Sequence, residues 1–200
     1  MESGRNFIIL DAVALRYMNY SLKNAFSGKI THLEIGFGNG QYLIDYALNK
    51  KDELFFGIEY AKKYFLKAFH KSQRYGLSNI KLIYGEALSV IYFLFPDDFF
   101  DLVHINFPDP WPKKRHNPRR LINDIFVNNL SRILKKEGEI YFASDHEEYF
   151  INSVTIFQNN GFKTEYISDL PNKDRIAKTK YEKDFIKSSK KIFYSVLKKS

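Results

Sequence analysis

The sequence predicts an α/β fold built on a doubly wound, mainly parallel sheet. Short apolar segments of strand length alternate with longer segments whose apolar residues recur at helical spacing, and this alternation is typical of βαβ units. Crossovers between parallel strands are right-handed, and ligands of such sheets bind beyond the carboxyl ends of the strands. We therefore expect the functional residues in the loops that follow the predicted strands.

Each element is predicted from its local pattern, in chain order. Residues 7–26 carry apolar positions at mixed helical spacing, so a helix is expected before the first strand. Short apolar segments are then predicted as strands at residues 30–35, 54–59, 80–84, 100–105, 140–144, 162–167 and 192–197. The amphipathic segments between them are predicted as helices at residues 42–48, 61–75, 87–95, 121–134 and 147–160.

Glycine and proline mark several of the predicted ends. Pro96 ends the helix 87–95, because proline lacks the amide hydrogen that a helix needs. Gly161 is expected to cap the helix 147–160, since glycine adopts the left-handed conformation at little cost. The proline-rich segment 106–118 interrupts the alternation and is predicted as a loop.

Composition limits the possible functions. The 200 residues suit one domain, residues 1–200, whose core takes up most of the 19 Phe and 14 Tyr side chains. Lys and Arg number 31 and Asp and Glu 23, so the net charge is 31 − 23 = +8, which favours a polyanionic partner. Cysteine is absent, which excludes disulfides, thiolate nucleophiles and cysteine zinc sites, and the five histidines show no metal-ligand spacing. We see no signal peptide and no membrane-length apolar segment, so we expect a cytoplasmic protein without a metal.

The loop after the first predicted strand points to a small cationic ligand. It contains Gly36, Gly38 and Gly40, and alternate glycines let the backbone turn tightly and approach a ligand closely. This spacing is not the Gly-x-Gly-x-x-Gly of dinucleotide sites, and Glu34 just before it would repel a pyrophosphate. S-adenosylmethionine, with its ammonium and sulfonium groups, fits better. Glu59 ends the second strand, where an acidic residue binds ribose hydroxyls in related folds.

The loop after the fourth predicted strand is the most informative part of the chain. Residues 107–116 are FPDPWPKKRH, and the prolines of this loop restrict its backbone so that Asp109 and Trp111 are held in place. Basic side chains follow at once: Lys113, Lys114, Arg115, His116, Arg119 and Arg120. Dense positive charge at the mouth of a ligand site favours a phosphate backbone as the partner.

Two resemblances follow from these loops. The glycine-rich turn, Glu59 and the Gly85-Glu86-Ala87 segment resemble the class I S-adenosylmethionine-dependent methyltransferases over residues 30–144. This implies a Rossmann-like sheet of seven strands, the last one antiparallel. The string FPDPWPKKRH closely resembles the motif of the tRNA (guanine-N7)-methyltransferase family, as do Ser144-Asp145-His146 and Thr179-Lys180-Tyr181-Glu182.

The resemblance implies a role for each matching residue. Glu34, Glu59, Glu86 and Asp109 would line the cofactor site with the three glycines, although the family usually has Asp or Asn where Glu86 stands. Contacts to the substrate would come from Lys113, Asp145, Thr179, Lys180, Tyr181 and Glu182. The substrate would be tRNA, with the target guanosine in the variable loop. The residues that would bind the RNA are Lys114, Arg115, His116, Arg119 and Arg120.

The expected chemistry needs neither a metal nor a covalent nucleophile. Guanine N7 already presents a free lone pair, so positioning and electrostatics suffice for attack on the sulfonium methyl. Asp109 is the candidate catalytic residue: it would hold the guanine N–H groups and offset the positive charge that develops on the purine.

Several alternatives stay open at this point. An adenine exocyclic-amine methyltransferase would have Asn-Pro-Pro-aromatic after the fourth strand, and Asn106-Phe107-Pro108-Asp109 departs from that pattern. A non-catalytic RNA-binding subunit would have damaged cofactor loops. From the sequence, Asp145 suits helix capping and substrate binding equally, and Trp111 either stacks on a base or pins the loop to the core. The chain is a monomer or a homodimer.

Overall fold

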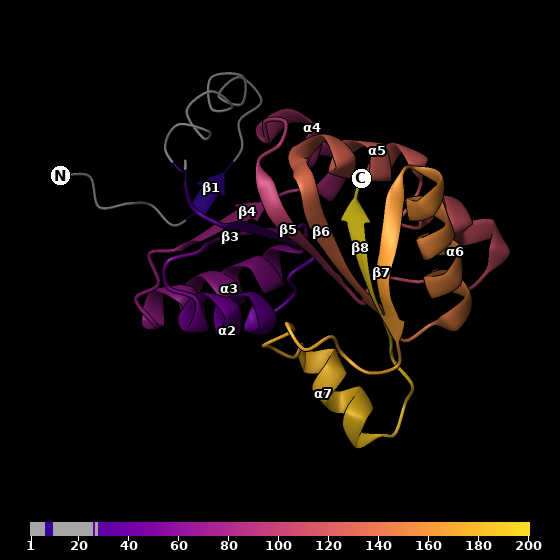
Figure 1. Ribbon diagram of the computed structural model, residues 1–200. Coiled ribbons are helices and arrows are strands. Elements are labelled where there is room, and N and C mark those ends of the chain that lie inside the picture. Colours follow the sequence, from indigo (N-terminus) through magenta and orange to yellow (C-terminus); the bar gives the residue numbers. More distant parts are fainter. Residues whose placement is uncertain (1–6, 10–25, 27) are drawn as a thin grey trace.

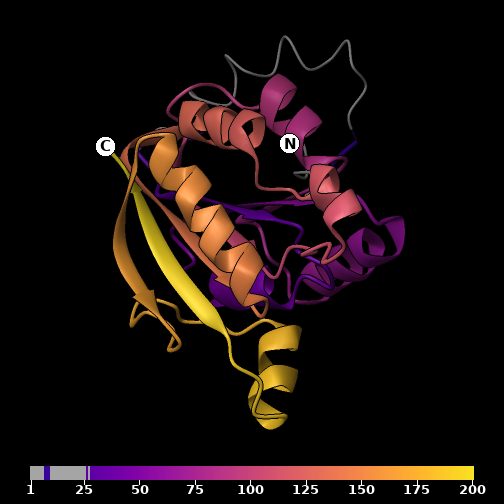
Figure 2. The same cartoon turned by 90° about the vertical axis from the view of Figure 1, so that its right-hand side faces the viewer.

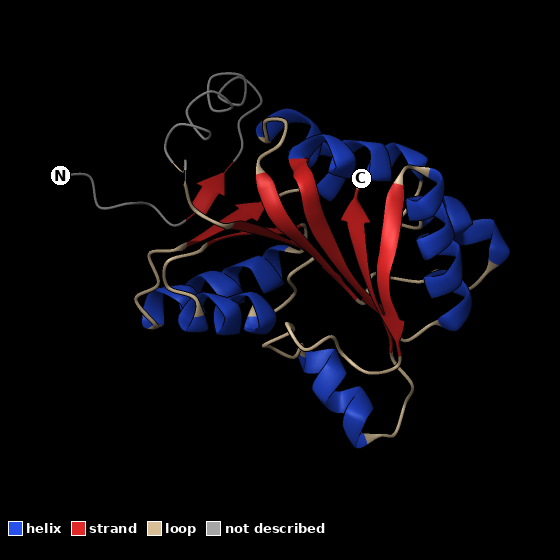
Figure 3. Ribbon diagram, viewed as in Figure 1, coloured by secondary structure: helices blue, strands red, loops and turns tan. Residues whose placement is uncertain are grey.

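The fold is centred on one eight-stranded sheet (Figures 1 and 3). The computed structural model describes residues 7–9, 26 and 28–200. The strands are β1 (Phe7–Ile9), β2 (Thr31–Ile35), β3 (Leu54–Glu59), β4 (Ile80–Tyr84), β5 (Phe100–Asn106), β6 (Leu134–Ser144), β7 (Phe162–Ser168) and β8 (Phe193–Lys199). The helices are α2 (Gln41–Asn49), α3 (Lys62–Arg74), α4 (Ala87–Leu94), α5 (Asp124–Ile133), α6 (Glu147–Asn159), α7 (Lys180–Lys187) and the 3-10 helix η1 (Lys114–Arg119).

The strand order is β1-β4-β3-β2-β5-β6-β8-β7. Neighbours from β1 to β6 are parallel, whereas β8 is antiparallel to both β6 and β7. The chain winds outward from β2 in one direction through β3 and β4, and from β5 in the other. The boundary between β2 and β5 is therefore the switch point at which a doubly wound sheet binds its ligand. The predicted parallel sheet with an antiparallel last strand is confirmed, with β1 added at one edge.

Helices cover both faces of the sheet. Helices α2 and α3 lie on one face, and α4, α5 and α6 lie on the other (Figures 1 and 2). Each layer has its own apolar core, and the larger one lies under α4, α5 and α6. Phe56 at its centre is in edge contact with Phe95, Phe99 and Phe100, with ring centroids 5.5–5.6 Å apart, so phenylalanine fills the core as expected. Helix α7 stands apart from both layers, beyond the end of β7.

Three local predictions need correction, and one helix was missed. The segment Phe7–Ile9 is a strand paired with β4, not the start of a helix, because a short run of Phe and Ile suits either state; the rest of the helix predicted at 7–26 falls largely outside the described residues. Helix α5 starts only at Asp124, where Asn123 accepts the Phe126 amide at 3.0 Å. Strand β6 begins at Leu134 and passes an irregularity in its pairing with β5. Helix α7 was not predicted.

We expect Gly40→Ala to destabilise the fold more than Gly161→Ala. Both glycines have positive φ, 73° and 86°, so each substitution strains the backbone by about 1 kcal/mol. A Cβ on Gly40 would also lie 2.5 Å from the Ala68 Cβ of α3, whereas nothing lies within 4 Å at Gly161. Overpacking adds about 1–3 kcal/mol. Urea unfolding of both variants measures the difference; equal losses would contradict close α2–α3 packing at Gly40.

Candidate active site at the carboxyl edge of the sheet

Glu34 lies at the switch point with one carboxylate oxygen unused. It is on β2, opposite Gly57 of β3 and His104 of β5, and is only 2 % exposed. Its Oε1 accepts the Asn106 amide at 3.1 Å, while its Oε2 has no hydrogen-bond partner among the described residues. Burial raises the pKa of this carboxyl to about 7, against the opposing effects of Asn106 and Arg175. A buried carboxylate oxygen without a donor suits a cationic ligand group such as an ammonium.

The glycine-rich loop and Glu59 form the next part of this edge. Glu59 is buried, and its Oε2 accepts the Gly38 amide at 2.8 Å while its Oε1 accepts the Ala61 amide at 2.8 Å. Gly38 has φ 54°, and a Cβ built on it would meet nothing within 4 Å. The carboxylate of Glu59 thus fixes the turn, and open space remains above Gly36 and Gly38. An exposed aromatic ring, Tyr60, follows directly, and its position was not among the predicted site residues.

Glu86 acts as a helix cap. Its carboxylate accepts the amides of Leu88 and Ser89 and the Ser89 hydroxyl at 2.7–2.9 Å. Partial burial would raise the pKa of Glu86, but these hydrogen bonds outweigh it and lower the pKa. The side chain is exposed at the same edge of the sheet. Both carboxylate oxygens already accept hydrogen bonds from the first turn of α4. The contact of Glu86 with an adenine stays a prediction.

The proline-rich loop is held in an unusual backbone conformation. Phe107 and Trp111, on either side of Asp109, have φ values of 52° and 43°. The Phe107 amide donates to the Ala143 carbonyl at 2.8 Å, which ties the loop to the end of β6. Non-glycine residues in this region are strained and cluster at functional sites. Asp109 is exposed between them, where it can meet a ligand from solvent.

The Trp111 side chain contacts its own loop. Its ring meets His116 edge-on at 5.6 Å between centroids, and the Arg119 guanidinium lies 5.1 Å from its centroid. Both contacts are to residues of η1, so Trp111 joins the motif loop to η1, most of which falls within the segment predicted as a loop. The two roles considered from the sequence, stacking on a base and pinning the loop to the core, stay predictions.

The basic residues of the motif divide into two groups. Lys113, Arg115 and Arg119 are exposed and His116 is partly so, whereas the side chain of Lys114 lies outside the described part of the structure. Arg120 is only 9 % exposed: its Nε donates to the Pro110 carbonyl at 2.8 Å, and its guanidinium packs over the Tyr149 ring at 5.2 Å. In this structure the donors of Arg120 hold the loop against α6, and its predicted contact with RNA stays a prediction.

Thr179 and Glu182 form a capping box at the start of α7. The Thr179 hydroxyl accepts the Glu182 amide at 3.0 Å, and the Thr179 amide donates to Glu182 Oε2 at 3.2 Å. Glu182 is fully buried and also accepts from Arg175 and from the Tyr194 hydroxyl at 2.9 Å. Glu182 thus anchors the helix, and its predicted contact with the substrate stays a prediction. Lys180 is exposed and Tyr181 is 59 % exposed, so these two present themselves to solvent.

Asp145 is exposed after β6, and the capping role considered for it belongs to its neighbour. His146 Nδ1 accepts the Tyr149 amide at 3.2 Å at the start of α6. Asp145 is left at the carboxyl edge of the sheet, next to the β5–β6 boundary that leads to the motif loop. This position agrees with its predicted contact to substrate.

Arg175 was not predicted from the sequence, although it joins the two halves of the site. Its Nη2 donates to Asn106 Oδ1 at 2.9 Å and to Glu182 Oε2 at 2.8 Å, and its Nη1 donates to the Tyr42 hydroxyl at 3.2 Å. Its side chain is 3 % exposed. Glu34 and Glu182 are thus connected through Asn106 and Arg175.

A chain of hydrogen bonds continues from Arg175 under α2. Tyr42 bonds to His104 Nδ1 at 3.0 Å, His104 Nε2 to His32 Nδ1 at 3.1 Å, and His32 Nε2 to Glu53 at 2.7 Å. Arginine only donates and a carboxylate only accepts. Each link therefore donates in one direction, from Arg175 to Glu53, and both neutral histidines carry their proton on Nε2.

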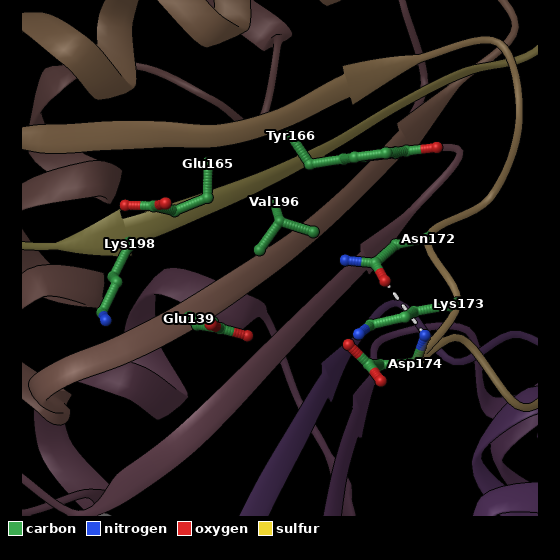
Figure 4. A pocket seen from close by; sticks show the side chains of 8 residues that line it. All are labelled: Glu139, Glu165, Tyr166, Asn172, Lys173, Asp174, Val196 and Lys198. Carbon is green, nitrogen blue, oxygen red and sulfur yellow. Dashed lines mark hydrogen bonds between the residues drawn. The ribbon is translucent and has the colours of Figure 1, made fainter.

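A groove elsewhere on the sheet is separate from this site. It has a volume of about 470 Å³ and lies on the face of β6, β7 and β8 (Figure 4). Its lining residues are Glu139, Glu165, Tyr166, Asn172, Lys173, Asp174, Val196 and Lys198. Asn172 accepts the Asp174 amide at 3.0 Å, which shapes the wall just before Arg175. Glu139 precedes Ala143, the partner of Asn106, by four residues or about 13 Å along β6.

Within residues 7–9, 26 and 28–200, no cluster of three His, Asp or Glu side chains is placed to bind a metal ion. Over the same described part, none of the helices has the length and apolar character that a membrane crossing requires.

Comparison with solved structures defines the class. The fold matches an S-adenosylmethionine-dependent methyltransferase from Aquifex aeolicus with a TM-score of 0.63 at 14 % identity, over 96 % of this chain and 100 % of that one. A family model described as putative methyltransferase matches residues 28–195. The orphan oxygen of Glu34 and the open space above the glycines fit the ammonium and the body of this cofactor. The fold and this edge define a class I S-adenosylmethionine-dependent methyltransferase.

Curated relatives narrow the class to one family. A tRNA (guanine-N(7)-)-methyltransferase of Thermotoga maritima is 37 % identical over 84 % of this chain, and one of Bacillus licheniformis is 34 % identical over 81 %. The chain spans 53 % of the length of the first and 77 % of the second. The chain belongs to the tRNA (guanine-N7)-methyltransferase family.

The histidine chain predicts a loss of stability in acid. Burial lowers the pKa of His32 below the unfolded value of 6.5. Burial, together with the electrostatic effects of His32 and Arg175, also lowers the pKa of His104 below that value. The unfolded chain then binds more protons at these two sites, so the contribution of the histidines to stability is complete above pH 6.5 and falls as the pH drops below it. Each histidine contributes at most about 1.4 kcal/mol per pH unit. Urea unfolding at pH 7.5 and 5.5 should show a smaller loss for His104→Gln than for the wild type. The exposed His70→Gln variant is the control, and equal losses in all three proteins would refute the assignment.

Proposed function

We propose that this chain, as a single methyltransferase domain of residues 1–200, transfers a methyl group from S-adenosylmethionine to N7 of a guanosine in cytoplasmic tRNA, forming 7-methylguanosine. The observation that carries the proposal is the juxtaposition of two features at one sheet edge. Glu34 offers an unpaired buried oxygen, and β5, its neighbour in the sheet, leads into the rigid loop that presents Asp109. The family resemblance favours the tRNA variable loop as the location of the target.

The residues of the edge divide the work of binding. When bound, S-adenosylmethionine supplies an electrophilic methyl group on a positively charged sulfur. Glu34 would hold the ammonium, Glu59 the ribose hydroxyls, and the open turn at Gly36 and Gly38 would let the backbone approach. Burial of Glu34 and Glu59 excludes water from their oxygens, which strengthens such contacts.

The motif loop then positions the base. Guanine N7 needs no deprotonation, so no general base is required at that atom. Asp109 would accept hydrogen bonds from the guanine N–H groups and offset the positive charge on the methylated purine. Because the backbone takes an unusual conformation on both sides, at Phe107 and Trp111, the loop presents Asp109 to solvent at the edge where the base would bind. Lys113, Asp145, Lys180 and Tyr181 are proposed to complete the substrate contacts.

Incubation with labelled S-adenosylmethionine and unmodified tRNA transcripts tests the function. We expect label in 7-methylguanosine after nucleoside analysis. Asp109→Ala should lower turnover by about 10²–10³-fold without changing the unfolding temperature, because the side chain is exposed. Asp52→Ala, also exposed but at the opposite edge of the sheet, is the matched control. Label in another nucleoside would refute the proposed function. Near-normal turnover of Asp109→Ala would refute the role of Asp109.

Substitution of the exposed Arg115 and Arg119 should affect tRNA binding, whereas substitution of the buried Arg120 should affect stability. Arg115→Gln with Arg119→Gln should weaken tRNA binding and reduce its salt dependence by about one unit of slope per lost phosphate contact. Arg120→Gln should instead cost about 1–3 kcal/mol of stability, because it frees the Pro110 carbonyl from its donor. Filter binding across salt concentrations and urea unfolding measure the two effects. The reverse pattern would contradict the division, and Lys51→Gln serves as an exposed control.

A further inference from the structure

We propose that Arg175 is a positioning residue that orients the cofactor carboxylate Glu34 through Asn106 and fixes the substrate segment at α7 through Glu182. This inference rests on the proposed function, since it concerns the residues that would hold S-adenosylmethionine and tRNA. It assigns no contact between Arg175 and either of them.

The guanidinium is enclosed on all sides by partners. Its Nη2 bridges Asn106 Oδ1 and Glu182 Oε2, its Nε reaches Glu182 Oε1 at 3.3 Å, and its Nη1 binds Tyr42. The rings of Tyr42 and Tyr194 lie 4.7 and 5.4 Å from its central carbon. A planar cation whose donors bond to several partners at once is restricted to one orientation. It therefore holds those partners in one arrangement as well.

The direction of these bonds sets the orientation of Asn106. Arginine cannot accept a hydrogen bond, so Asn106 must present its oxygen to Arg175 and its NH₂ group to Glu34. The reversed amide would place its oxygen against the Glu34 carboxylate and its NH₂ group against a cation. Arg175 therefore ensures that Glu34 Oε1 is occupied and that Oε2 is the oxygen left for a ligand.

The same residue governs the charge at Glu34. Within the described part of the chain, the titratable and charged groups that act on this carboxyl are Tyr42 and Tyr46 from α2, Glu59 from β3 and Arg175, beside the backbone N–H of Leu43. Arg175 is the only cation among them, and it lowers the pKa of Glu34, as does the amide that it orients, while burial and Glu59 raise it. Without Arg175, Glu34 would stay protonated to a higher pH and would lose its attraction for an ammonium.

The second end of the guanidinium reaches the substrate segment. Glu182 completes the capping box that starts α7, from which Lys180 and Tyr181 extend into solvent. Loss of the Arg175–Glu182 pair would leave a fully buried carboxylate without its cation. A change at Arg175 should therefore affect cofactor affinity and the KM for tRNA together.

The test measures S-adenosylmethionine binding by equilibrium dialysis between about pH 5.5 and about pH 9, without tRNA. Glu34 must be ionised to bind the ammonium, so wild-type affinity should rise with pH through about 7. In Arg175→Gln the rise should move to higher pH by about one unit, with about fivefold weaker binding at pH 7. Tyr194→Phe removes a donor from Glu182 but leaves the Arg175–Asn106 bond in place, and it should keep the wild-type midpoint. Arg132→Gln, which removes donors from the Phe95 and Ile91 carbonyls far from Glu34, controls for a general loss of stability.

An unchanged midpoint in folded Arg175→Gln would overturn the proposal, as would an equal shift in Arg132→Gln. If Arg175→Gln does not fold, Asn106→Asp replaces it, because it keeps Arg175 and puts a second carboxylate beside Glu34. Its midpoint should also rise, and an unchanged midpoint would again overturn the proposal. The readout does not depend on which nucleoside is methylated, so a shifted midpoint with label outside 7-methylguanosine would refute the proposed function and leave this inference standing.

Discussion

A carboxylate withdrawn from water is the constraint on which this edge of the molecule depends. Glu34 sits in the middle of the sheet, at the switch point between β2 and β5, with one oxygen satisfied and one not. Such a group is tolerated only where a donor, a cation or a ligand compensates for lost hydration. Asn106 supplies the donor and Arg175 the nearby cation. The remaining oxygen is what makes the switch point a binding site for a positively charged ligand.

On the substrate side of the site, the loop that carries Asp109 is already held in place before any ligand binds. Two strained residues flank Asp109, and the Arg120 guanidinium holds the Pro110 carbonyl. Packing and charge-assisted hydrogen bonds offset the conformational entropy that this loop loses on folding. The loop therefore need not lose that entropy when a base binds. The exposed basic residues then stand on a rigid frame. The same division between fixed frame and exposed contact recurs at α7, where Glu182 is inside and Tyr181 is outside.

The sequence was sufficient for the sheet, the glycine turn and the acidic strand ends, because each is encoded within a few adjacent residues. Glu34 and Glu59 could be located since parallel strands bring their carboxyl ends to one edge. Arg175 could not, because its partners Tyr42 and Asn106 lie 133 and 69 residues away in sequence. The burial of Arg120 and Glu182 was missed for a related reason: both occur in segments with several exposed residues, and only tertiary packing buries them. The capping box of α7 was the one missed feature with a local signal, Thr-x-x-Glu.

The hydrogen-bonded chain through His104 and His32 has a consequence beyond its own stability. It runs from Arg175 at the carboxyl edge of the sheet to Glu53, which directly precedes β3 at the amino edge. All of its donors point the same way, so their bond dipoles add, with a cation at one end and an anion at the other. Aligned bonds of this kind polarise one another in a low-dielectric interior. The two edges of the sheet are therefore coupled electrically through side chains, and the field that reaches the ligand site includes a contribution from a glutamate on the opposite edge.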